Sequence, residues 1–229
     1  MKVRPGAVIG LVAALLLTGC GAKDSAAPKA KASASASRSA PAPTEAQLKS
    51  ALLTVADLPA GYKVDPSAST ADDDGATSDN PACTDTFKGF EKATLGKDAP
   101  HVEAGFTGGE NGPFLIQSLV GLDGDEASKE FALFRDALRK CTTWTETDRD
   151  GTKTTNTLAP MAFAKFGDDT KSMKLTLNKP PLTVTANFIT VRVGGTLCVL
   201  IHLGVPAVAA ADTEALVRKA TEKIDRATG

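Results

Sequence analysis

Two long apolar segments joined by a Gly-Gly pair limit the fold more than any other part of this sequence. Residues 182–193 and 196–203 are rich in Val, Ile, Leu and Thr, and Gly194-Gly195 between them is a two-residue loop typical of a β-hairpin. Residues 197–201 are apolar on both faces, which predicts a central strand covered by helices. In the first segment the apolar positions change from even to odd numbers near Phe188, which predicts a bulge or a strong local twist.

The rest of the chain from residue 44 supplies further strands and helices around this hairpin. An extended pattern is found in residues 102–106, 114–122, 142–147, 153–157 and 172–178. Helices are predicted from residue 44 to about 58, after Cys83 through Phe87 and Phe90, from 125 to 140, and from 212 to about 226. Long antiparallel strands with a few helices predict an α+β domain, with an antiparallel sheet of about five to seven strands covered by helices.

The ends of the first and last helices carry capping signals. Thr44 and Gln47 are spaced as a capping box, and Pro59 with Gly61 is expected to stop the first helix. Asp212 is the expected N-cap of the last helix. Four apolar residues of that helix are expected to face inward: Leu216, Val217, Ala220 and Ile224.

The first 20 residues resemble a bacterial lipoprotein signal. Residues 6–17 form an apolar segment of about a dozen residues, shorter than the about 20 that a membrane-spanning helix needs. The following Leu17-Thr18-Gly19-Cys20 is similar to the lipobox: an aliphatic residue, two small residues and a cysteine. The resemblance implies cleavage between Gly19 and Cys20 and lipidation of the Cys20 thiol. The alternative is a soluble secreted protein that is cut elsewhere.

The composition divides the chain into three parts. Residues 1–19 form the expected signal peptide, residues 20–43 a lipidated cysteine with a disordered Ala/Ser/Pro/Lys-rich tether, and residues 44–229 a single α+β domain. The formal net charge of the whole chain is -1, and the chain has 2 histidines. The near-neutral charge argues against a nucleic-acid partner, and the low histidine count argues against a histidine-based metal site.

Three cysteines remain for the domain, and export places them in an oxidising compartment, where a disulfide is expected. Cys83 begins one helix and Cys141 follows another, both near surface loops. Cys198 is flanked by large aliphatic residues in the central strand, as a buried thiol would be. Three pairings are open, and we expect Cys83 to pair with Cys141 and Cys198 to stay reduced.

Several short motifs are similar to those of secreted actinobacterial (Streptomyces-like) lipoproteins and of the PknH-like extracellular sensor domain of mycobacterial receptor kinases. The opening 52–62 (LLTVADLPAGY), Cys83 after a proline, Cys141 after the central helix, and Val191 to Gly194 carry this resemblance over residues 48–224. It implies an extracytoplasmic binding or sensing module without catalysis. Members usually have two disulfides, whereas this domain has three cysteines.

Candidate chemical motifs favour structural roles. Asp72-Asp73-Asp74-Gly75 has consecutive acids and an early glycine, unlike an EF-hand loop, so we interpret it as a solvated loop. Asp148-x-Asp150-Gly151 and the glycine-rich residues 105–112 are expected to be turns. Cys198 and His202 lie about 13 Å apart on one strand face, too far to share a metal ion.

The remaining polar and aromatic candidates also lack a catalytic pattern. His202 is expected to be a packed or capping residue, and His101 has no visible partner. Trp144 and Tyr62 could line a pocket, although core packing is the commoner role. No hydrolase, nucleotide-binding or zinc-protease motif occurs, so we expect no catalytic residue, metal or cofactor.

The sequence therefore predicts a lipid-anchored protein on the extracytoplasmic side of the cell membrane. Its partners are the membrane, through the anchor, and an unidentified small molecule or protein. The first hypothesis is a non-catalytic binding or sensing module. The second is a carrier of a lipid or hydrophobic small molecule in a cleft between sheet and helices, and the third is a hydrolase.

Overall fold

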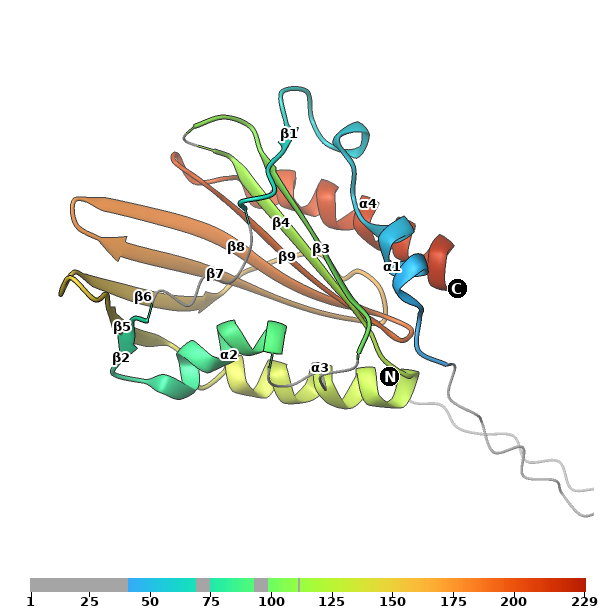
Figure 1. Cartoon of the computed structure of the whole chain (residues 1–229), viewed down its shortest axis with the longest axis horizontal. Helices are drawn as coiled ribbons and strands as arrows, with labels where there is room; N and C mark the ends of the chain where they lie inside the picture. The colour runs from blue at the N-terminus through green and yellow to red at the C-terminus, as the bar shows by residue number, and fades with distance from the viewer. Residues whose placement is uncertain (1–40, 69–74, 93–98, 111) are drawn as a thin grey trace, which may run out of the picture. The chain divides into compact units, whose positions relative to one another are not determined.

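The structure is a computed structural model that describes residues 41–68, 75–92, 99–110 and 112–229 (Figure 1). The predicted signal peptide, the lipobox with Cys20, and the tether up to residue 40 lie outside these ranges. The acidic loop residues Asp72, Asp73 and Asp74 lie outside them as well.

Within the described ranges, nine strands form one antiparallel sheet in the order β1-β3-β4-β9-β8-β7-β6-β5-β2. The strands are β1 (Lys63–Val64), β2 (Thr77–Ser78), β3 (His101–Thr107), β4 (Phe114–Gly121), β5 (Thr143–Thr147), β6 (Lys153–Pro160), β7 (Asp169–Lys179), β8 (Leu182–Val193) and β9 (Thr196–Gly204). The sheet is larger than the expected five to seven strands. The two short edge strands, β1 and β2, have 2 residues each, too few for an alternating pattern to show in the sequence.

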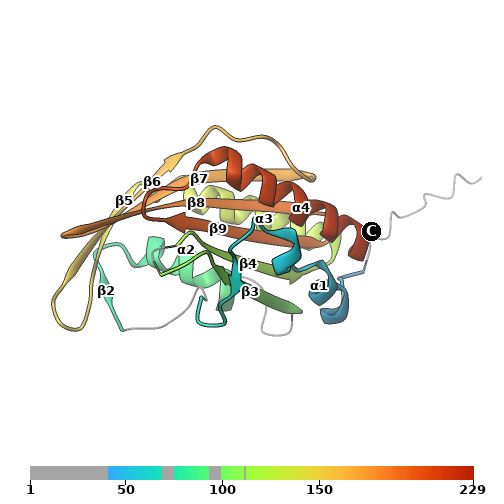
Figure 2. The same cartoon turned by 90° about the horizontal axis from the view of Figure 1, so that it is seen from above.

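Helices cover both faces of this sheet, which confirms the predicted α+β class (Figures 1 and 2). The helices of the described residues are α1 (Glu45–Ala51), α2 (Pro81–Lys92), α3 (Gly124–Leu138) and α4 (Ala210–Thr228). On one face, α1 and α4 pack on a core that includes Leu115, Ile189 and Leu200. On the other face, α3 packs on a second core that includes Val120, Phe188 and Val199.

The predicted β8–β9 hairpin lies at the centre of the sheet. β8 pairs with β7 from Arg192 to Leu182, and with β9 from Val193 to Thr185, without a break in register. These paired segments therefore contain no bulge, and the predicted bulge is wrong, whereas the alternative of a strong local twist stays a prediction. The apolar positions change parity because residues 186–191 are buried on both faces, where no alternation is required.

The first helix is shorter than predicted. The capping box of Thr44 and Gln47 is present, but α1 ends at Ala51 and Leu52 is already extended. The chain leaves the helix here because the buried side-chain oxygen of Gln117 in β4 accepts a 2.7 Å hydrogen bond from the Leu53 amide. The next turn is a separate 3₁₀ helix, η1 (Val55–Asp57).

The last helix begins two residues earlier than predicted, at Ala210, so Asp212 lies inside the first turn and is not the N-cap. The N-cap is Ala209, which forms no side-chain hydrogen bond there. All four residues predicted to face inward from α4 are buried, which confirms that part of the prediction.

A disulfide joins Cys83 at the start of α2 to Cys141, three residues after α3, with a Cα–Cα distance of 5.4 Å. Cys198 is free and buried on the α4 face of β9. Among the helices of the described residues, none combines the length and the apolar character that crossing a membrane requires.

Candidate functional site

A pocket of about 350 Å³ lies at one end of the sheet, where the β3–β4 loop, the last residues of β9 and the beginning of α4 come together. The same end of the sheet carries β1 and the segment before it (upper part of Figure 1). Much of the wall is apolar, formed by Pro59, Pro113, Val208 and Leu216. Three side chains with polar groups also line it: Tyr62, His202 and Asp212.

Tyr62 and His202 form a buried polar pair in this wall. The Tyr62 hydroxyl lies 2.9 Å from Nε2 of His202, and the two side chains are 8% and 2% exposed. The residues are 140 positions apart in the sequence. The pair therefore links the loop after η1 to the central strand β9.

A network of hydrogen bonds behind this pair fixes the imidazole ring. Nδ1 of His202 lies 2.9 Å from the Thr213 hydroxyl of α4, and Asn187 of β8 donates to that hydroxyl at 2.8 Å. Asn187 and Thr213 are themselves buried. Both ring nitrogens of His202 thus have partners, and three different elements hold the side chain in place.

The electrostatics of the pair keep both side chains uncharged near neutral pH. Burial lowers the pKa of His202 to about 4, although the nearby Asp212 carboxylate opposes this change. Burial and the same carboxylate raise the pKa of Tyr62 above its ordinary value. The fixed charge of the pocket wall is therefore the exposed carboxylate of Asp212.

The backbone before Tyr62 is shaped by a turn that the sequence predicts. Gly61 has a φ of 101°, in the left-handed region that glycine adopts without a steric penalty. The turn is anchored to α4, because Lys219 donates to the Asp57 carbonyl at 2.6 Å and Lys223 donates to the Asp57 carboxylate at 2.7 Å. These contacts hold η1 against the second half of α4, and Pro59 to Tyr62 then line the pocket together with Asp212 and Leu216 from the first half of the helix.

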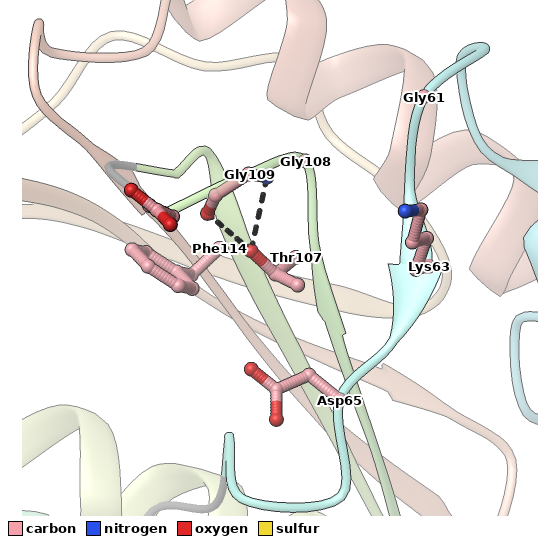
Figure 3. Close-up of a pocket in the computed structure, with 8 residues that line it drawn as sticks. Gly61, Lys63, Asp65, Thr107, Gly108, Gly109 and Phe114 are labelled. Atoms are coloured by element: carbon pink, nitrogen blue, oxygen red, sulfur yellow. Dashed lines mark hydrogen bonds between the residues drawn. The ribbon is translucent and has the colours of Figure 1, made fainter.

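A second pocket of about 390 Å³ adjoins the first, and Gly61 and Gly108 line both. Figure 3 shows Lys63 and Asp65 on the β1 segment, with Thr107 and Phe114 on the facing β3–β4 hairpin. The Thr107 hydroxyl donates to the Gly109 carbonyl at 2.6 Å and closes the hairpin loop (dashed in Figure 3). Because Lys63 and Asp65 line it, the second pocket has more charged side chains than the first, to which Asp212 contributes.

The other residues singled out from the sequence have structural positions. Trp144 is buried and stacks on Phe87 at a centroid distance of 5.1 Å, as core packing requires. His101 lies 2.8 Å from the Ser118 hydroxyl, so the expectation that it lacks a partner is wrong. Residues 148–152 form the predicted hairpin turn between β5 and β6.

In the glycine-rich stretch, residues 105–107 end β3, and Gly108, Gly109 and Glu110 enter the loop before β4 and line the second pocket. In the described part of the chain, no three His, Cys, Asp or Glu side chains are grouped so that they could hold a metal ion.

The pocket combines residues that sequence reasoning treated separately. The sequence predicts a core or pocket residue at Tyr62, a packed or capping residue at His202 and a helix cap at Asp212, and the fold brings all three to one wall. No local pattern could have joined them, because they come from a loop, a strand and a helix. The wall is mostly apolar with a few fixed polar groups, an arrangement suited to holding a small molecule.

Comparisons with known proteins found a similar solved structure that supports the fold. No family model matches the chain, and no curated protein matches it. Among solved structures, the chain is similar to the crystal structure of the extracellular domain of PknH from Mycobacterium tuberculosis. The two are 14% identical with a TM-score of 0.59, and the match covers 81% of this chain and 98% of that chain. The likeness shows that the domain has the fold that the sequence resemblance implied.

Proposed function

We propose that the chain is a non-catalytic binding module on the extracytoplasmic side of the membrane, and that its ligand is a small molecule held in the pocket beside Tyr62 and His202. The pocket itself is the observation that carries this proposal. Its volume of about 350 Å³ is in the range of small-molecule sites, which are mostly apolar with a few fixed polar groups.

Two observations support the extracytoplasmic location. Disulfides persist in oxidising compartments and are rare in the cytosol, and the domain contains the Cys83–Cys141 disulfide. The solved structure with the similar fold is an extracellular domain. Attachment to the membrane is proposed through a lipid on Cys20, on the strength of the lipobox at residues 17–20.

The role we favour is sensing, in which ligand binding changes the domain or its contacts. The apolar share of the wall also supports the second hypothesis, a carrier that delivers a hydrophobic molecule. The two roles differ in ligand release, because a carrier passes its ligand on. Transfer of a bound hydrophobic molecule to acceptor vesicles would favour the carrier.

Native mass spectrometry of the full chain, released in detergent from its own host, tests the binding proposal. Ala60 is exposed and lines the pocket, so Ala60→Trp is expected to fill it without disturbing the core. Ala215→Trp, at an exposed position of α4 that does not line the pocket, is the matched control. We expect a ligand mass on the wild-type chain and on the control, and none on Ala60→Trp. A ligand mass retained by Ala60→Trp contradicts the proposed site.

A further inference from the structure

The pocket beside Tyr62 and His202 has a defined hydrogen-bond polarity, which follows from the network behind it. The amide nitrogen of Asn187 donates to the Val208 carbonyl at 3.4 Å and to the Thr213 hydroxyl at 2.8 Å. The Thr213 hydroxyl donates its one hydrogen to the Ala209 carbonyl at 3.3 Å. With its hydrogen on the Ala209 carbonyl, Thr213 accepts in its contact with His202.

This bonding pattern favours the tautomer of His202 in which Nδ1 carries the hydrogen. Since Thr213 accepts, Nδ1 of the neutral imidazole carries the hydrogen and donates it across 2.9 Å. Nε2 then has no hydrogen and accepts from the Tyr62 hydroxyl at 2.9 Å. The hydrogen of Tyr62 is used inside the wall, and its oxygen can offer the pocket a lone pair but no donor.

The charge of the pocket wall favours the same kind of ligand as its hydrogen-bond acceptors, one that carries donors. Asp212 contributes a carboxylate, and no Lys or Arg is among the described residues that line this pocket. Asp212 lies in the first turn of α4, where the helix dipole favours a negative charge, so the protein itself already supplies the anion that this helix end would attract. An anionic ligand would be repelled, whereas a cationic ligand would be attracted.

We infer that the pocket takes a monocationic amphiphile, a molecule with a protonated amine at one end and an apolar body. The ammonium group would donate to the Asp212 carboxylate and the Tyr62 oxygen. The apolar body would lie against Pro59, Pro113, Val208 and Leu216. This inference rests on the proposed function, because it names the ligand class of the same pocket.

Three probes of equal chain length test it: octylamine, 1-octanol and octanoate. Their affinities for the purified full chain are measured by isothermal titration calorimetry at neutral pH, where octylamine is cationic. We expect octylamine to bind about tenfold more tightly than octanol, and octanoate to bind most weakly. Asp212→Asn should lower the octylamine affinity to that of octanol. Glu222→Gln, which removes an exposed carboxylate of α4 outside the pocket, should leave it unchanged.

The outcomes separate this inference from the proposed function. If octanol or octanoate binds as tightly as octylamine, and Ala60→Trp blocks that binding, the pocket is a binding site and the inferred ligand class is wrong. The same holds if Asp212→Asn has no effect on octylamine binding. If Ala60→Trp changes the binding of none of the three probes, the pocket is not the site, and the proposed function fails together with the inference.

Discussion

His202 combines deep burial with a titratable ring, and this combination makes the stability of the fold depend on pH. In the unfolded chain its pKa is the ordinary 6.5, whereas burial lowers the pKa to about 4 in the folded protein. Between these values the unfolded state binds a proton that the folded state does not bind. The contribution of the neutral His202 side chain to the free energy of unfolding is therefore complete above pH 6.5, and it is lost as the pH falls towards 4.

We expect the free energy of unfolding to fall by about 3 kcal/mol between pH 7 and pH 4 through this one residue. The measurement is urea denaturation at intervals of half a pH unit, on the wild type and on His202→Gln. The variant is expected to be less stable at pH 7, because it loses part of the network, but to show a much smaller slope over this interval. Parallel curves for the two proteins would contradict the assignment of the slope to His202.

At the scale of elements, one carboxylate fastens the η1 turn to α4. Burial by itself raises the pKa of Asp57, but hydrogen bonds from Lys223 and Thr54 outweigh this effect and lower the pKa to about 2. The Asp57 and Lys223 side chains are 26% and 17% exposed. The contact therefore holds η1, five residues before Tyr62, against the second half of the last helix.

Asp57→Asn should lower the free energy of unfolding at pH 7 by about 1 kcal/mol, because water partly screens the pair. A lowered carboxyl pKa gives stability above its ordinary 3.8 that is lost as the pH falls through about 2. The difference from wild type should therefore shrink below pH 3, as followed by thermal unfolding. Glu45→Gln, which breaks the exposed Glu45–Lys49 pair, is the control and should have no measurable effect. A difference that persists unchanged at pH 2 would refute the ion-pair explanation.

A second link between elements is the disulfide from Cys83 in α2 to Cys141, three residues after α3. It closes a loop with a sequence separation of 58, and the chain-entropy model gives it about 4 kcal/mol of stabilisation. We expect the double variant Cys83→Ala/Cys141→Ala to lose about this amount in urea denaturation. Wild-type protein with a reducing agent should match the variant, and the variant itself should not respond to the reductant. If the double variant is as stable as oxidised wild type, the packing of α2 and α3 holds these helices in place without the disulfide, which contradicts the prediction.

At the scale of the whole molecule, the proposed anchor determines where the domain is found. Cys20 is expected to carry lipid, so cells grown with a labelled fatty acid should yield labelled wild-type protein that lacks residues 1–19. Cys20→Ser should carry no label, whereas Cys198→Ala, which alters the buried thiol of β9, should keep it. If the Cys20→Ser variant carries label, the lipid is attached to another residue and Cys20 is not the anchor.

Local patterns determined the fold class and most of the elements. Alternation with a period of two and helical spacing depend on neighbours in the sequence, so the central β8–β9 hairpin, α3 and the buried face of α4 could be predicted. Features without a local pattern could not be predicted from the sequence. The two-residue strands β1 and β2 are too short to show a period, and the end of α1 depends on Gln117, which lies 64 residues from its partner Leu53.

The candidate site was decided by the tertiary structure. Tyr62, His202 and Asp212 each have an ordinary local role, in a turn, a strand and a first helical turn, and only strand order and helix packing bring them to one wall. The Tyr62–His202 contact spans 140 residues, and the low pKa of His202 comes from burial that no sequence window records. The sequence by itself thus determined which segments form strands and helices, because backbone periodicity is local. The pocket and its charge depended on the tertiary structure, because they arise from contacts between distant segments.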